Sequence, residues 1–142
     1  MQLSEHFTLE EMTASETASR RGIDNTPPQS VIDALKVACA GMERVRSILG
    51  QPIHVNSGYR SPKLNVAIGG SKTSAHVTGY AVDFICPGFG DPLTVARAIK
   101  NHGIHFDQLI FEHTWVHISF APRMRGEVLT LKGKGYVSGI VQ

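Results

Sequence analysis

The segment TSAHVTGYAVDF, residues 73–84, contains a histidine and an aspartate that could bind the same metal ion. His76 lies among small and polar residues, which predicts a turn in which its ring can move to meet a metal. Gly79 permits a sharp bend without the steric penalty of a Cβ atom. Ala81 and Asp83 then share one face of the following strand, because side chains two residues apart point the same way. The small Ala81 leaves room for Asp83 to reach toward His76, so this segment offers two metal ligands.

A catalytic zinc ion takes three protein ligands and keeps a fourth position for water, so a third ligand is needed. His117, in the segment TWVHIS, alternates with Trp115 and Ser119 on one face of its strand. A histidine in the middle of a strand is more often a structural residue than a ligand, so His117 alone does not establish a metal site. Glu112, at the end of the preceding strand, could lie over the same site as the general base of metal-assisted hydrolysis. Taken singly, Glu112 fits a solvated hairpin residue better.

Helices with clear end signals surround these residues. Thr8 and Glu11 form a capping box, which predicts a short helix after Thr8. Asp91 as N-cap and Gly103 as C-cap delimit a second helix, and a third short one is expected after Ser61. The longest helix is predicted within residues 27–50, because apolar residues recur there at helical spacing: Val31, Ile32, Leu35, Ala38, Met42, Val45 and Leu49.

The remaining segments read as strands. Alternating or β-branched residues predict strands within 52–57 and 80–87. Two further strands, within 106–112 and 114–120, are separated by so little chain that they should form a hairpin. The tail 127–142 is expected to add a last strand or hairpin. Helices that precede and interrupt mostly β segments predict an α+β fold, with an antiparallel sheet flanked by helices.

Composition restricts the class of protein. The chain has 142 residues, of which 42% are hydrophobic and 18% charged, so we expect one globular domain over residues 1–142. No apolar run is long enough for a membrane span, and no signal peptide is visible at the start. The net charge of +2 comes without the basic clusters of a nucleic-acid surface, so nucleic acid is not an expected partner. Cys39 and Cys86 lie in apolar surroundings and are expected to be free buried thiols.

Three segments together resemble a known enzyme family. They are SGYRS (57–61), SAHVTGYAVDF (74–84) and FEHTWVHIS (111–119). In this order and spacing they are similar to the zinc peptidases grouped as lysostaphin, D-alanyl-D-alanine carboxypeptidase and hedgehog-like, and most of all to the D-alanyl-D-alanine carboxypeptidase family. That family's pattern is S-x-H-x-x-G-x-A-x-D followed by W-x-H or H-x-H. Its positions are met by Ser74, His76, Gly79, Ala81, Asp83, Trp115 and His117.

The resemblance covers residues 8–122 and leaves 123–142 as a C-terminal tail. It implies that His76, Asp83 and His117 bind Zn²⁺ and that Glu112 is the catalytic carboxylate. Arg60 would hold a carboxylate of the substrate, a role that suits the planar fork of a guanidinium group.

Two further residues would line the substrate pocket, namely Ser74 and Trp115.

The position of the catalytic base in this chain departs from that in several relatives. Several relatives carry their catalytic acid three residues before the last zinc ligand, where this chain has Thr114. Glu112 is five residues before His117, so either the turn carries Glu112 into place or His113 contributes to catalysis instead.

The function expected from this resemblance is zinc-dependent hydrolysis of peptidoglycan stem peptides. A compact chain without a visible signal peptide is similar to phage-type endolysins, which favours cleavage of the L-alanyl-D-glutamate bond. Such a protein would be made in the cytoplasm and act, as a monomer, on the bacterial cell wall after release. The alternatives are a D-alanyl-D-alanine carboxypeptidase and a non-catalytic hedgehog-like or phage structural domain in which zinc holds the fold together.

Overall fold

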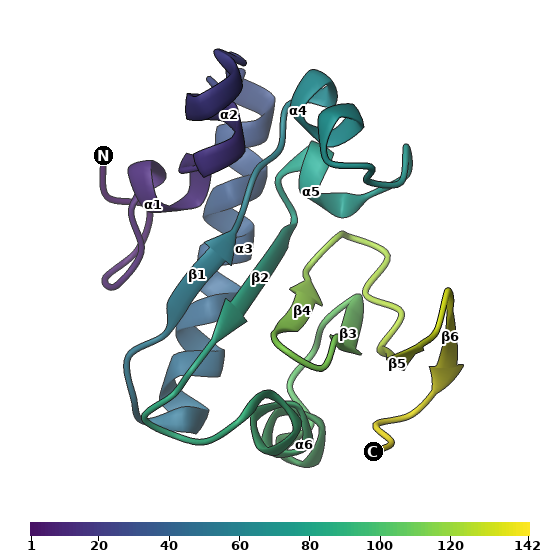
Figure 1. Cartoon of the computed structure of the whole chain (residues 1–142). Helices are drawn as coiled ribbons and strands as arrows, with labels where there is room; N and C mark the ends of the chain where they lie inside the picture. Colours follow the sequence, from purple (N-terminus) through teal and green to yellow (C-terminus); the bar gives the residue numbers. More distant parts are fainter.

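A six-stranded sheet runs through the molecule, with the strands in the order β1-β2-β4-β3-β5-β6. The computed structural model describes all of residues 1–142 (Figure 1). The strands are β1 (His54–Ser57), β2 (Ala81–Ile85), β3 (Gln108–Phe111), β4 (Val116–Ser119), β5 (Glu127–Lys132) and β6 (Gly135–Ser138). The helices are α1 (Leu9–Thr13), α2 (Glu16–Arg21), α3 (Gln29–Leu49), α4 (Pro62–Ala67), α5 (Ala75–Thr78) and α6 (Pro92–His102). The predicted α+β class is confirmed.

The helix ends follow the local signals in the sequence. The Thr8 hydroxyl accepts from the Glu11 backbone N–H, and the Glu11 side chain accepts from the Thr8 N–H, which completes the predicted capping box of α1. The Asp91 carboxylate accepts from the Thr94 N–H at the start of α6, and Gly103 ends that helix in the left-handed conformation. These contacts satisfy backbone groups that the helix itself leaves unpaired.

One face of the sheet packs on α3 and α6 to form the core. Val82 and Phe84 of β2 and Val116 and Ile118 of β4 are fully buried on this face. In Figure 1, α3 lies behind β1 and β2. Of the apolar stripe predicted for α3, all residues are buried except Ile32, which is half-buried. The other face of the sheet is therefore free to carry a functional site.

The sheet differs from the prediction in one pairing. β1, β2, β4 and β3 are joined by antiparallel pairs, as is the β5–β6 hairpin, but β5 pairs with β3 in parallel. The predicted antiparallel sheet is thus confirmed in four of its five strand pairs, and the β3–β5 pair is a parallel exception that the sequence analysis did not predict. The connection 120–126 crosses from the end of β4 and brings β5 alongside β3 in the same direction, which local strand signals do not reveal. The hairpin of the C-terminal tail thus belongs to the main sheet.

Two smaller findings concern the whole chain. Cys39 and Cys86 are both free and buried, as predicted. The structure contains no helix of the length and hydropathy that a membrane span requires.

Replacing Gly41 by alanine should destabilise the fold. Gly41 lies in α3, and a Cβ atom there would overlap the ring of Phe120, which is only 2% exposed. Overpacking of this kind costs about 1–3 kcal/mol, and the better helix propensity of alanine returns about 1 kcal/mol. We expect the free energy of unfolding, measured by urea denaturation, to fall by the difference, up to about 2 kcal/mol.

The matched control is Gly135→Ala, because no heavy atom lies within 4 Å of a Cβ built at that position. This variant should unfold within about 0.5 kcal/mol of the original protein. A Gly41→Ala protein that is more stable than the original, as the helix propensity of alanine alone would make it, would contradict the close packing of Gly41 on Phe120.

Candidate metal centre and its cleft

His76, Asp83 and His117 come together on the free face of the sheet. One ligand atom of each lies within 4.8 Å of the others. Asp83 of β2 is directly opposite His117 of β4 in the antiparallel register, so both side chains point to the same face. The Oδ1 atom of Asp83 is 2.9 Å from Nδ1 of His117 and 3.1 Å from Nε2 of His76. The three residues therefore converge as the sequence predicts.

His76 is held differently from the prediction. It lies in the one-turn helix α5, not in a loose turn, and only 2% of its surface is exposed. Ser74 caps this helix by accepting from the His76 backbone N–H, and Gly79 ends it with a φ of 92°. A left-handed φ of this size is easy only for glycine. The expected freedom of the ring was wrong, because the histidine is buried and its Nδ1 bonds to the Gly58 carbonyl oxygen.

The protonation of His76 suits metal binding. Its Nδ1 donates to the carbonyl oxygen of Gly58 over 2.7 Å, since a carbonyl can only accept. Burial lowers the pKa of His76, so the ring is neutral and its Nε2 carries a lone pair. That Nε2 is buried and has no hydrogen-bond partner, although it faces a carboxylate oxygen. Two lone pairs facing each other are satisfied by a shared cation, so these residues fit a bound metal ion.

Gly58 is a functional position that the sequence analysis missed. A Cβ atom at Gly58 would overlap the backbone oxygen of Met12, so only glycine fits there. The next two residues bond to the same helices, because the Tyr59 N–H donates to the Met12 carbonyl of α1 and the Arg60 N–H donates to the His76 carbonyl of α5. This segment clamps α5 against α1 and orients the His76 ring. The glycine in SGYRS was the available signal.

Asp83 is kept ionised by its neighbours. Burial alone would raise the pKa of Asp83, but the histidines that face it, His76 and His117, together bring that pKa below its ordinary value. Its second oxygen, Oδ2, is 3.3 Å from Nη2 of Arg60. Arg60 also donates from Nε to the Ser57 hydroxyl. The structure therefore places Arg60 behind Asp83 as a brace, while leaving it in the wall of the cleft.

Glu112 lines the same cleft as the three ligands. A tight turn brings it there: its N–H donates to the Trp115 carbonyl, and the Thr114 N–H donates to the Glu112 carbonyl. Burial raises the pKa of Glu112, the nearby Asp83 raises it further, and His117 and Arg60 oppose this. A half-buried carboxylate of this kind suits a general base.

The turn directs the neighbouring residues away from the cleft. His113 has a positive φ of 68°, and its Nε2 is 2.6 Å from the Leu131 carbonyl oxygen on β5. Neither His113 nor the exposed Thr114 lines the cleft. Of the two predicted possibilities, the structure thus brings Glu112 to the ligands and leaves His113 outside.

The cleft has a volume of about 560 Å³ and is lined mainly by polar groups. Ser74 and Trp115, predicted to contact substrate, both line it, and the Trp115 Nε1–H is buried without an acceptor. The sequence analysis did not anticipate that Arg123, Arg125 and Tyr136 would line it as well. These three residues come from the C-terminal tail, and no local motif marks them.

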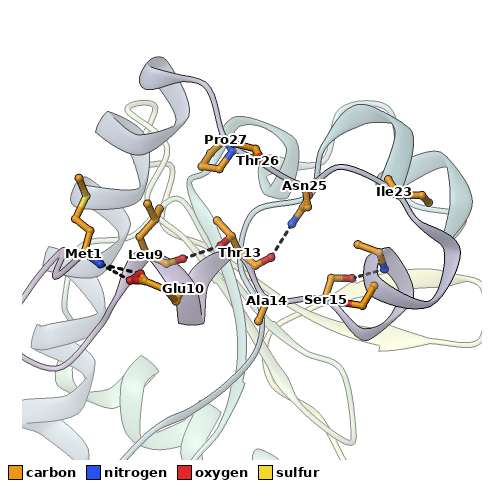
Figure 2. A pocket seen from close by; sticks show the side chains of 12 residues that line it. Met1, Leu9, Glu10, Thr13, Ala14, Ser15, Ile23, Asn25, Thr26 and Pro27 are labelled. Carbon is orange, nitrogen blue, oxygen red and sulfur yellow. Dashed lines mark hydrogen bonds and ion pairs between the residues drawn. The ribbon is translucent and has the colours of Figure 1, made fainter.

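A second hollow of about 540 Å³ lies between α1, α2 and the segment that follows α2 (Figure 2). Its wall contains one carboxylate, Glu10, which contacts the amino group of Met1, and neither histidine nor cysteine. The Asn25 amide donates to the Thr13 carbonyl at its edge. This hollow therefore has no set of side chains for metal binding.

Comparison with known proteins agrees with this site. The model of the family described as peptidase M15 matches residues 5–119, which include all three candidate metal ligands and Glu112. The zinc D-Ala-D-Ala carboxypeptidase of Streptomyces albus G is 36% identical over 63 residues, which are 44% of this chain and 24% of that enzyme. The chain thus spans about a quarter of the length of that relative. The family resemblance predicted from the sequence is confirmed, and the chain belongs to the peptidase M15 family.

Proposed function

We propose that this chain is a zinc metallopeptidase that hydrolyses the stem peptides of peptidoglycan. The observation that carries the proposal is a ligand set of two histidines and one aspartate in the same cleft as a separate carboxylate, Glu112. Catalytic zinc sites take three protein ligands and keep one position open, whereas structural sites are closed by a fourth. The arrangement therefore favours catalysis over a zinc ion that only holds the fold together.

His76, Asp83 and His117 would hold the zinc ion. When bound, zinc would polarise the scissile carbonyl group and lower the pKa of a water molecule to about 7. Glu112 accepts a proton from the water molecule while the water oxygen adds to the carbonyl carbon. It then delivers that proton to the leaving amine as the C–N bond breaks. Because its pKa is above the ordinary value, Glu112 exchanges this proton closer to neutral pH than an exposed glutamate.

The charges in the cleft favour an anionic peptide. Its lining includes Arg60, which follows β1, and Arg123 and Arg125, which lie between β4 and β5. Arg125 is paired with the buried Asp107 through two bonds, of 2.9 and 3.0 Å. Arg123 has a single contact to Asp107 at 3.4 Å, and 64% of its side chain is exposed, so most of its donors are available to a ligand. Guanidinium groups pair well with carboxylates, which stem peptides carry at D-glutamate and at the terminal D-alanine.

The bond that we propose is L-alanyl-D-glutamate, which would make the chain an endopeptidase of the endolysin type. Arginines that reach the cleft from separate segments of the chain suit a substrate whose acidic groups lie away from its terminus. The alternative is removal of the terminal D-alanine, as the name of the Streptomyces relative indicates for that protein.

Hydrolysis of purified peptidoglycan should depend on zinc. We expect the zinc-loaded protein to release fragments that begin at D-glutamate, chelator-treated protein to release none, and added zinc to restore the activity. Mass spectrometry of the fragments identifies the bond, since loss of terminal alanine alone would indicate the carboxypeptidase. If folded, zinc-loaded protein releases nothing from several wall types, the catalytic proposal is wrong and the metal has a structural role.

A further inference from the structure

The register of the sheet aligns the C-terminal hairpin with the metal centre. Residues paired on neighbouring strands point to the same face. One row of such pairs crosses the sheet from strand to strand and consists of Ser57, Asp83, His117, Ile110, Leu129 and Ser138. On β6, Tyr136 is two residues from Ser138 and therefore points to this same face. The hairpin thus presents Tyr136 on the face that carries the ligands.

Tyr136 also lies in the row that contains Glu112. Tyr136 of β6 pairs with Leu131 of β5. The preceding residue of β5, Thr130, pairs with Phe111 of β3, which directly precedes Glu112. Two strand spacings of about 4.8 Å separate β6 from β3, so the backbones of Tyr136 and Glu112 are about 10 Å apart. The long tyrosine side chain can extend over much of this distance. Both residues line the cleft.

The surroundings of Tyr136 support its position inside the site. The residue is 53% exposed, so it is open to a ligand. Burial of part of the ring raises the pKa of its phenol, and the negative charges of Glu112 and Asp83 raise it further. Tyr136 lines the same cleft as both of these carboxylates. A phenol whose pKa lies above its ordinary value of 10 is protonated at neutral pH and can donate a hydrogen bond.

We propose that the Tyr136 phenol donates a hydrogen bond to the carbonyl oxygen of the peptide bond that is being hydrolysed. This inference rests on the proposed peptidase function and adds a substrate contact to it. As water adds to the carbonyl carbon, that oxygen gains negative charge, and a donor aimed at it becomes stronger. The phenol keeps its proton throughout, while Glu112 carries the proton that moves from water to the amine.

The contact lies outside the part of the chain shared with the family. The family match ends at residue 119, whereas Tyr136 is on β6. β5 attaches the hairpin to the edge of β3, in parallel register, next to the centre of the site. Peptidase M15 proteins with another C-terminal segment would therefore complete this wall of the cleft in another way.

The test is Tyr136→Phe, which removes only the hydroxyl group. A hydrogen bond that strengthens in the transition state lowers kcat when it is lost and leaves KM nearly unchanged. We expect kcat for stem-peptide hydrolysis to fall about 10- to 100-fold, the range for a hydrogen bond to a charged group. The control is Val137→Ala, on the same strand but with its side chain on the opposite face of the sheet, which should keep kcat within about twofold of the original. Circular dichroism and thermal unfolding check that both variants fold.

A binding measurement separates failure of this inference from failure of the proposed function. A phosphinic analogue of a stem dipeptide places a charged oxygen where the carbonyl oxygen would lie, and its affinity for zinc-loaded protein is measured by calorimetry. We expect Tyr136→Phe to weaken its binding at least tenfold and Val137→Ala to leave it unchanged. If the original protein hydrolyses peptide and Tyr136→Phe matches it in kcat and in affinity, the inference is wrong and the peptidase function stands. If the original protein neither cleaves peptide nor binds the analogue, both are wrong.

Discussion

Zinc affinity should fall by more than about 10²-fold when Asp83 is replaced by asparagine. Loss of a partner that only orients a ligand typically costs 10- to 100-fold in metal affinity, and Asp83 is itself in the ligand set. The asparagine amide keeps the shape of the side chain but removes the negative charge that both histidines face. Competition with a chromogenic chelator measures the affinity, and peptide hydrolysis should be lost in parallel.

The control for this variant is Asp33→Asn on the exposed surface of α3, where the carboxylate accepts only from Gln29. It should bind zinc as the original protein does. Removing a buried charge while its partners remain can also unfold a protein. The Asp83→Asn variant must therefore first be shown to be folded by circular dichroism. A folded Asp83→Asn protein with unchanged zinc affinity would exclude this residue as a ligand.

Replacing Glu112 by glutamine should lower kcat by about 10²–10⁴-fold while zinc affinity stays within a few-fold. Glu112 is not in the ligand set, so the metal site remains complete, but glutamine cannot accept the proton from water. The magnitude is that of general acid–base catalysis. Calorimetric titration with zinc measures the zinc affinity, and peptide-hydrolysis assays measure kcat. The control is Glu16→Gln, at an exposed glutamate that faces Arg20 on α2, which should leave both unchanged.

The pH profile gives a second measure of Glu112. A general base must be ionised to act, so activity is lost as the pH falls through its pKa. Since burial raises that pKa above its ordinary value of 4.5, the acidic limb of kcat/KM should lie at a higher pH than an exposed glutamate would give. In Glu112→Gln this limb should disappear from the residual activity. A Glu112→Gln protein with the original rate and the original limb would show that another group is the base.

Local elements of the fold were predictable because their signals are local. The capping box of Thr8 and Glu11, the cap at Asp91 and the break at Gly103 each involve residues within a few positions of one another. The apolar spacing of α3 predicted its buried face for the same reason. The parallel pairing of β3 with β5 was not predictable, because it depends on how the connection 120–126 crosses the sheet.

The candidate site divides in the same way. From the sequence alone, residue chemistry and spacing, together with the family resemblance that these segments carry, predicted the candidate metal ligands His76, Asp83 and His117 and the candidate base Glu112. Only the tertiary structure decided the rest. The Gly58 carbonyl selects the tautomer of His76, Arg60 braces Asp83, and Tyr136 enters the cleft from the last strand. Each of these contacts joins segments that are distant in the chain, and strand register and helix packing, rather than any local motif, bring them together.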